Sequence, residues 1–433
     1  MNPTLFELAQ QLTATARDRG ARAAQVYGCT RKITDLGSRG GRPSPKHSDA
    51  EHLAVTVWLA DGRTSTAVGT LHQGTHLVEE ALSDAAAGTP DPNAAPIERL
   101  EGAGRSLDIN DRRGLQITDA DRAETLLSNL TAAQSVDKRV KTGRFWWQDV
   151  VEQRALVNTK GVELQEQTTT FRMGGEVTVD TPRPITLSDA CASRSFSTTA
   201  CLPFGARLAR WGEALLADEI DHTGPVRVLL RPRACAAILA WISARVTDEC
   251  AAPGSTFIRD MLPFHPKIHL IDDGSLPGGL KTRGFDDHGV PPQPLVLFRE
   301  GHVHGSMMAT LEAQRQSRRP SGHMCDGRLQ TTNLFLNGGV RSIHARLGEL
   351  EGPVLSLDHL PWELNIDPAT GDIDQVVHGQ WFDGQEPAGV VTHRHLRGNL
   401  VEALRRVVRV ASDTDRHLHV DAPGLFLDGL SLD

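Results

Sequence analysis

The sequence predicts an α+β fold in two domains, and its length and two residue patterns support this prediction. The chain has 433 residues, and single hydrophobic cores stop growing near about 250 to 300 residues. Helical and strand patterns alternate in the N-terminal half, whereas short strands separated by Gly and Pro dominate the C-terminal half. The pattern changes near residue 221, so we expect a mixed α/β domain over residues 1–221 and a mostly β, barrel-like domain over residues 222–433.

The first predicted element is a helix that begins after Thr4. Thr4 and Glu7 have the spacing of a capping box, and apolar residues at helical spacing follow as far as Gly20. The other elements expected in this half are a hairpin over residues 53–68 that turns at Asp61-Gly62, helices over residues 75–88 and 118–133, and a hairpin over residues 153–170 that turns at residues 158–161.

The C-terminal half is expected to contain a buried helix among short strands. Residues 233–245 have few polar positions on any side, which is typical of a buried helix. The expected strands cover residues 226–230, 268–271, 294–298, 303–308, 333–336 and 376–381, and a late helix is expected over residues 401–410.

Charge, cysteine content and hydropathy narrow the class of protein. The chain has 46 Lys and Arg against 54 Asp and Glu, a net charge of -8, so nucleic acid is not expected as a partner. The six cysteines are scattered without a Cys-x-x-Cys motif, a pattern of free thiols in a reducing compartment. No 18 consecutive apolar residues occur, and the first residues lack the pattern of a secretory leader. We therefore expect a soluble, cytoplasmic protein without a membrane partner.

Several common catalytic motifs are absent from the sequence. Zinc-hydrolase helices use His-Glu-x-x-His, because two imidazoles one turn apart hold the ion beside a carboxylate, but this chain has no His-Glu dipeptide. A phosphate loop ending in Gly-Lys-Ser/Thr, a Gly-x-Gly-x-x-Gly sequence and a Gly-x-Ser-x-Gly elbow are also missing. The sequence therefore lacks the usual motifs of nucleotide hydrolases and of serine hydrolases.

Three His-x-His pairs are candidates for a metal site. In a strand, residues i and i+2 share a face, so each pair could bind a metal ion together. The alternative is that each pair lies on a surface hairpin or a strand edge without any ligand. The pairs are His302/His304, His393/His395 and His417/His419.

A Gly-rich segment over residues 272–290 combines four carboxylates with a histidine. Such a loop could expose backbone N–H groups and place Asp286, Asp287 and His288 at a site. The alternative is a structural crossover in which the Asp side chains bond to their own turns.

Two further features have both a functional and a structural interpretation. The aromatic cluster Phe145-Trp146-Trp147 could stack on a ligand, but we favour a role in the core or in a subunit contact. Cys325 has His323 two residues away and could be a nucleophile, although the sequence shows no partner that would orient the pair.

The order of short motifs along the chain resembles the TldD/PmbA family, also called the modulator of DNA gyrase family. The resemblance covers nearly the whole chain, is strongest from about residue 222 onward, and includes Gly62-Arg63 and the turn at residues 158–161 in the N-terminal half. The C-terminal motifs are Leu276 to Leu280, Phe285 to Val290, Leu295 to Gly305, Met307 to Ala309, Thr332 to Leu334, Gly338, Gly371-Asp372, Gly379, Gly384, Gly398 to Leu400 and Ala422 to Leu430.

The resemblance implies a fold and different roles for two subunits. Members of the family pair two related chains: a TldD-type chain carries His-Glu-x-x-x-His on a helix and binds zinc, and a PmbA/TldE-type chain lacks this motif and helps to enclose a peptide channel. The helix that corresponds here is the one predicted over residues 233–245, with Ala240, Trp241 and Arg245 near the ligand positions. These side chains cannot ligate zinc, so the resemblance is to the metal-free chain.

The resemblance leads to a functional hypothesis with two rivals. The chain is expected to have no cofactor of its own and to pair with a TldD-like subunit that holds zinc, enclosing the path of a peptide or amide substrate. One rival is a self-sufficient metallohydrolase with a His-x-His site, and the other is a non-enzymatic binding or modulator protein. The expected wall residues of the substrate channel, none of them catalytic, are Asp286, Asp287, His288, Thr332 and Asn333.

Two departures from the family pattern suggest a specialised member. His288 stands where the family commonly has an acidic residue, and a Gly/Arg-rich insert lies near residue 40. A diverged member fits peptide or natural-product maturation better than a housekeeping role.

Overall fold

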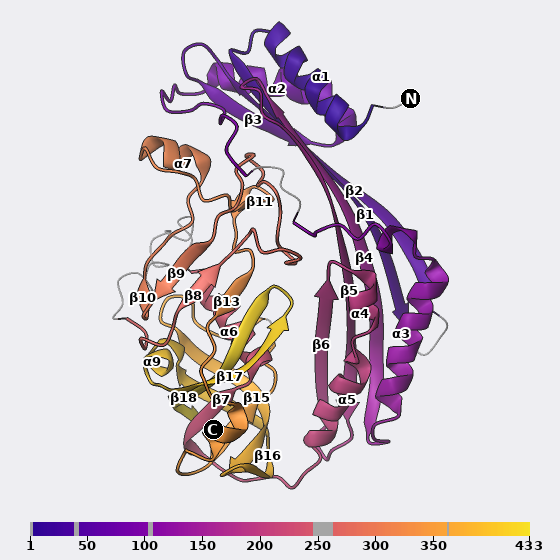
Figure 1. Cartoon of the computed structure of the whole chain (residues 1–433), viewed down its shortest axis with the longest axis vertical. Helices are drawn as coiled ribbons and strands as arrows, with labels where there is room; N and C mark the ends of the chain where they lie inside the picture. Colours follow the sequence, from indigo (N-terminus) through magenta and orange to yellow (C-terminus); the bar gives the residue numbers. More distant parts are fainter. Residues whose placement is uncertain (1–2, 39–42, 103–106, 246–262, 362) are drawn as a thin grey trace.

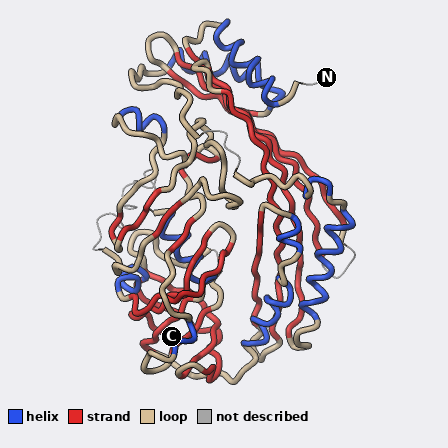
Figure 2. The backbone as a smooth tube through the Cα atoms, in the orientation of Figure 1, coloured by secondary structure: helices blue, strands red, loops and turns tan. Residues whose placement is uncertain are grey.

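Two large β-sheets organise the chain, as a computed structural model shows (Figure 1, Figure 2). The structure describes residues 3–38, 43–102, 107–245, 263–361 and 363–433. The first sheet is antiparallel, has the order β3-β2-β1-β4-β5-β6 and belongs to the N-terminal half. Its strands are β1 (Ala23–Ser38), β2 (Ser44–Trp58), β3 (Thr64–Gly69), β4 (Val140–Asn158), β5 (Glu163–Val179) and β6 (Ile185–Ser193).

Helices cover one face of this sheet, and the C-terminal half lies against the other (Figure 1). On β4, the odd-numbered Phe145, Trp147 and Val157 are buried in cores shared with the helices, whereas the even-numbered Glu152 and Arg154 lie on the opposite face. The covering helices are α1 (Leu5–Asp18), α2 (Gly74–Ala87), α3 (Asp119–Gln134), α4 (Phe196–Ala200) and α5 (Phe204–Ala214), with short 3-10 turns η1 (Leu71–Gln73) and η2 (Gly114–Gln116).

Five strands of the second sheet close into a ring. β7 pairs with β14 and β18, and β15 and β16 connect β14 back to β18. The predicted barrel-like, mostly β character of this half is therefore confirmed. The strands are β7 (Gly224–Leu230), β8 (Leu270–Asp272), β9 (Leu295–Arg299), β10 (His302–Val303), β13 (Leu334–Leu336), β14 (Val354–Leu357), β15 (Asp372–Asp383), β16 (Glu386–Asn399), β17 (Val407–His417) and β18 (Val420–Leu432).

The helix α6 (Pro232–Ser243) packs against β17 and β18 of this sheet and is almost completely buried. Pro232 occupies its first turn, where a missing N–H costs nothing. The remaining elements are the hairpin of β11 (Met324–Cys325) and β12 (Arg328–Leu329), and the helices α7 (Thr310–Arg315), α8 (Ile343–Leu347) and α9 (Leu400–Arg405).

Most predicted elements are present, and two predictions are wrong. The capping box of Thr4 and Glu7 starts α1 as expected. The helix predicted over residues 401–410 ends at Arg405, because the β-branched residues after it pair with β18. Of the strand predicted over residues 303–308, only Val303 lies in a strand, as the second residue of β10.

The proposed boundary after residue 221 lies between α5 and β7 and remains a prediction. Within the described ranges, no helix combines the length and the apolar character needed to cross a bilayer.

Candidate functional site: a charged cavity between the two halves

The loop that follows Phe285 attaches the C-terminal half to the first sheet. Phe285 and Val290 are both 0% exposed and pack in one cluster with Tyr27 on β1 and Leu156 on β4. Arg154 adds a cation–π contact, since its guanidinium carbon lies 5.5 Å from the centre of the Phe285 ring. This contact positions the Gly-rich segment over the polar face of the sheet.

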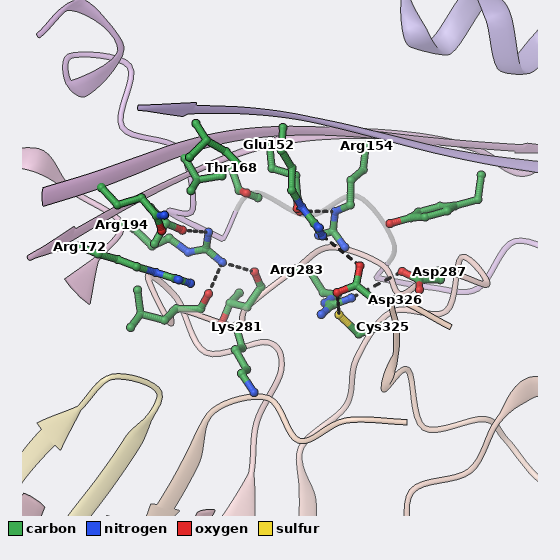
Figure 3. A pocket seen from close by; sticks show the side chains of 18 residues that line it. Glu152, Arg154, Thr168, Arg172, Arg194, Lys281, Arg283, Asp287, Cys325 and Asp326 are labelled. Atoms are coloured by element: carbon green, nitrogen blue, oxygen red, sulfur yellow. Dashed lines mark hydrogen bonds and ion pairs between the residues drawn. The ribbon is translucent and has the colours of Figure 1, made fainter. Parts of the chain in front are cut away.

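A cavity of about 370 Å³ lies beside this contact, between β1, β4 and β5 on one side and residues 280–287 and 325–326 on the other (Figure 3). Its sheet wall consists of cross-strand neighbours, because Arg31 pairs in register with Glu152, and Glu152 with Thr168. Charged and hydroxyl side chains therefore line the cavity in rows set by strand register.

One end of the cavity is an ion-pair network. Arg31 Nε donates to Glu152 Oε2 at 2.5 Å, and Arg31 Nη2 donates to Asp326 Oδ1 at 3.0 Å. Arg154 lies 3.3 Å from Glu152 and also pairs with Glu166. Although burial raises the pKa of Glu152, the nearby Arg154 and Arg31 hold its pKa below the usual value. The carboxylate therefore stays ionised and paired.

At the other end, Arg194 is held by neutral oxygens only. Its five N–H groups donate to the carbonyl oxygens of Thr169, Gly279, Leu280 and Thr282 and to the hydroxyl of Thr170, at 2.6 to 3.1 Å. Burial lowers the pKa of Arg194 to about 9. Arg194 thus joins the sheet to the Gly-rich segment and keeps its positive charge at neutral pH.

The five predicted wall residues lie in different surroundings. Asp287 lines the cavity, 3.8 Å from Arg283, and accepts a hydrogen bond from Gly327 N. Asp286 is buried behind it and accepts from the backbone N–H groups of residues 288, 290 and 324, which hold the loop in shape. Burial raises the pKa of Asp286. His288 lines a separate pocket of about 180 Å³ and bonds to Thr310 Oγ1 at 2.9 Å.

Thr332 and Asn333 lie behind the cavity wall. Thr332 N donates to Asp272 Oδ2 at 2.8 Å, so this threonine joins β8 to the turn before β13. Asn333 accepts from Lys281 N at 3.0 Å and donates to Thr282 Oγ1 at 2.9 Å. Both side chains are buried and support the segment that lines the cavity. The role of the five residues in substrate binding stays a prediction.

The three His-x-His pairs lie in different surroundings. His302 and His304 are exposed. His393 bonds to Arg183 O, whereas His395 bonds to Asp374 Oδ1. His417 ends β17, and His419 follows in the turn.

A group with metal-like spacing forms around His417 instead. One ligand atom each of Asp189, His359 and His417 lies within 4.8 Å of the other two. However, Arg233 Nη1 donates to Asp189 Oδ2 at 2.5 Å and to His417 Nδ1 at 3.1 Å. Arg207 lies 3.5 Å from the same carboxylate. The two guanidinium groups supply the positive charge that a metal ion would bring.

Cys325 lacks the surroundings of a nucleophile. His323, the residue suggested as its base, bonds to Ser321 O at 2.9 Å and to Asp272 Oδ1 at 3.3 Å. Burial raises the pKa of the Cys325 thiol, although Arg283 opposes this effect. The thiol is therefore mostly protonated at neutral pH, which weighs against nucleophilic catalysis.

The aromatic cluster on β4 serves the core. Phe145 and Trp147 are both 0% exposed, and Trp147 contacts Phe196 with ring centres 5.6 Å apart. Trp146, on the other face, covers Gly174. The interpretation as core residues is confirmed for Phe145 and Trp147.

The donor set of α6 does not fit zinc. Its twelve residues include no His, Asp or Glu, and its cysteine, Cys235, is buried among apolar side chains that raise the thiol pKa far above the usual value. Trp241 and Arg245, near the expected ligand positions, contact each other, with the guanidinium carbon 4.8 Å from the ring centre.

The sequence signal for the cavity was present but ambiguous. Residues 153–170 are rich in Gln and Thr, and this composition indicates one solvated face of a hairpin. Only the position of the second half shows that this face borders an enclosed cavity.

Comparisons with known proteins agree with this architecture. Residues 223–433 match the family model described as the PmbA/TldA metallopeptidase C-terminal domain. A metalloprotease of Synechocystis sp. is 26% identical over 157 residues, and the match spans 34% of this chain and 33% of that relative.

Solved structures show the same fold over almost the whole chain. A protein described as a modulator of DNA gyrase from Thermotoga maritima has a TM-score of 0.85 at 21% identity, covering 99% of this chain and 100% of that one. TldE from Thermococcus kodakarensis has a TM-score of 0.83 at 15% identity, covering 98% and 99%. Residues 223–433 therefore match the PmbA/TldA metallopeptidase C-terminal domain, and the chain as a whole has the fold of these solved structures.

Proposed function

We propose that this chain is the subunit without its own catalytic metal in a heteromeric TldD/TldE-type metallopeptidase. It would enclose the path by which an extended peptide or amide substrate reaches the zinc of a TldD-like companion carrying His-Glu-x-x-x-His. A role in peptide or natural-product maturation fits the divergence at His288 and near residue 40.

The observation that carries this proposal is the chemistry of α6. The helix where the family resemblance places zinc ligands offers only alkyl, indole and hydroxyl groups, the guanidinium of Arg233 and one protonated thiol. None of these groups binds zinc well, because the ion takes imidazole, thiolate or carboxylate donors. On this proposal, hydrolysis uses the zinc site of the companion subunit.

Features of the first sheet support the substrate-binding part of the proposal. β6 is an edge strand, so one side of its backbone has no partner strand in the described part of the sheet. An extended peptide can bind such an edge through main-chain hydrogen bonds with little dependence on sequence. The charged cavity lies on the same side of the sheet as the C-terminal half.

The test is reconstitution of peptide hydrolysis with a TldD-like companion. We expect turnover of an unstructured peptide by the pair and none by this chain alone. A pair in which the motif Glu of the companion is replaced by Gln is the control and should be inactive. Turnover by this chain alone would contradict the proposal.

One specific observation favours a second candidate function, a metallohydrolase that acts alone. The group of Asp189, His359 and His417 has two imidazoles and one carboxylate, a donor set that binds several transition metals. The hydrogen bonds of Arg233 to two of these three residues weigh against it. Metal analysis of the isolated chain separates the two candidates.

The third hypothesis, a non-enzymatic binding protein, predicts binding of a partner without any effect on turnover. Equal activity of the companion with and without this chain would favour it.

A further inference from the structure

The cavity of Figure 3 has a surplus of positive charge. Six cationic side chains and three carboxylates line it, a difference of three charges, although the whole chain has a net charge of -8. When Glu166, which pairs with Arg154 from outside the lining, is included, the difference is still two. The six cationic residues are Arg31, Arg154, Arg172, Arg194, Lys281 and Arg283.

The surplus is concentrated at one end. Arg31, Arg154 and Arg283 have carboxylate partners. Figure 3 shows Arg172, Arg194 and Lys281 at the opposite end of the cavity from Asp287 and Asp326. The cavity therefore has a paired end and a cationic end.

Two residues at the cationic end have capacity for a ligand. The side chain of Arg172 makes no hydrogen bond or ion pair within the described part of the chain. The Nζ atom of Lys281 donates to Thr331 O at 3.2 Å, and its ammonium group has three N–H donors. Arg194 has used all five of its donors on neutral oxygens, so it contributes charge but no further hydrogen bond.

The surroundings penalise these cations in the absence of an anion. Burial lowers the pKa of Arg172, and burial together with Arg283 and Arg172 lowers the pKa of Lys281. A lowered pKa of a base means that its charged form is destabilised. An anion placed between Arg172 and Lys281 would remove this penalty and gain charge-assisted hydrogen bonds.

We infer that the end of the cavity formed by Arg172, Arg194 and Lys281 binds a carboxylate group of the peptide substrate. Arg172 can hold both carboxylate oxygens in a bidentate pair, and Lys281 adds a second donor. The hydroxyl group of Thr170 lines the same space. A volume of about 370 Å³ is large enough for a peptide terminus or an acidic side chain.

This inference rests on the proposed function, but its test needs binding only. The probes are three acetylated tetrapeptides: one with a free C-terminal carboxylate and no acidic side chain, its C-terminal amide, and an amide with one internal Asp. Their affinities are measured by calorimetry for the chain alone and for its complex with a companion. Failure of the companion to hydrolyse peptides would overturn the proposed function without changing these affinities.

The variants are Arg172→Met and Lys281→Met, with Arg416→Met as the matched control because Arg416 is exposed and pairs with Asp421. We expect at least one carboxylate peptide to bind the wild-type chain or complex about tenfold or more tightly than the plain amide, and Arg172→Met to remove this preference. Tighter binding of the free-terminus peptide or of the Asp peptide identifies the source of the carboxylate.

A stability readout separates loss of binding from loss of folding. Because the two cations are destabilised by burial, both Met variants should unfold at a temperature no lower than the wild-type chain. The inference is overturned if the plain amide binds as well as both carboxylate peptides, if no probe binds the chain or the complex, or if Arg172→Met and Arg416→Met bind the carboxylate peptides equally.

Discussion

The Nη1 atom of Arg233 lies 2.5 Å from Oδ2 of Asp189 and connects the first residues of α6 with the edge strand β6. The same nitrogen lies 3.1 Å from Nδ1 of His417 on β17. One guanidinium group therefore links both halves of the chain. It also takes part of the space that a metal ion would need between the carboxylate and the imidazole.

Replacement of Arg233 by Met should destabilise the fold. The side chain of Asp189 is only 5% exposed, and it would keep contacts with Arg207 at 3.5 Å and with His417 at 3.8 Å. Removing one partner of a buried ion pair typically costs about 3 kcal/mol or more of unfolding free energy, and Arg207 should reduce this cost to about 2 kcal/mol. Urea unfolding measures the difference.

Arg416→Met is the control for Arg233→Met, since its ion pair with Asp421 is exposed and should contribute less than about 1 kcal/mol. The double variant Asp189→Asn/Arg233→Met should recover part of the loss. If Arg233→Met is as stable as Arg416→Met, the contact of Arg233 with Asp189 does not stabilise the fold.

The folded state should lose stability as the pH falls from about 6.5 to 4. Burial, reinforced by Arg233, lowers the pKa of His417 to about 4, whereas an unfolded histidine titrates near 6.5. The unfolded chain therefore binds a proton in this range and the folded chain does not, so unfolding becomes more favourable as the pH decreases. This histidine alone accounts for on the order of 3 kcal/mol.

Comparison of His417→Asn with the wild-type chain isolates this contribution, because the amide oxygen can still accept from Arg233. The variant should show a weaker decrease of unfolding free energy between pH 6.5 and 4. His302→Asn is the control, since His302 is exposed in the folded chain and should leave the pH dependence unchanged. An unchanged slope in His417→Asn would mean that the pKa of His417 is the same in the folded and the unfolded chain.

Replacement of Gly205 by Ala should disturb the packing of α5 on α3. A methyl group at this position would lie 1.9 Å from Asn129 O, and the backbone N–H of Gly205 donates to Asn129 Oδ1 at 3.0 Å. Overpacking of this kind costs about 2 to 3 kcal/mol, measurable by thermal or urea unfolding. Gly37→Ala, with open space around the added atom, should be nearly neutral.

The described thiols should differ widely in reactivity. Burial raises the pKa of Cys29 and of Cys191 to about 12, whereas Cys201 is exposed. Iodoacetamide at neutral pH should therefore modify Cys201 first, and mass spectrometry should find Cys29 and Cys191 unmodified in the native chain. Cys325 should react more slowly than Cys201, because burial raises the pKa of its thiol. Modification of Cys325 faster than of Cys201 would support the hypothesis that Cys325 is a nucleophile.

Local sequence signals predicted the elements whose start and end are set by near neighbours. The Thr4 and Glu7 capping box, the Asp61-Gly62 turn and the turn at residues 158–161 each act within a few residues, and each is present in the structure. The sequence pattern does not predict β18, because Pro423 and Gly429 interrupt it. In the structure, four other strands pair with β18. Its stability comes from partners distant in the sequence.

The cavity could be predicted only in part for the same reason. The Gly-rich segment was recognised, and Asp287 does line the cavity. Arg172 and Arg194 lie about a hundred residues earlier, and nothing near them in the sequence indicates that they meet Lys281. Register on β4 and β5 and the docking of Phe285 bring them together.

The metal content of the isolated chain tests the central claim most directly. The chain is purified alone, incubated with zinc, desalted and analysed by mass spectrometry of the elements, beside the Asp189→Asn and His417→Asn variants. We predict that all three samples hold far less than one metal ion per chain. One tightly bound ion per wild-type chain, lost in both variants, would contradict the claim that this subunit relies on a metal held elsewhere.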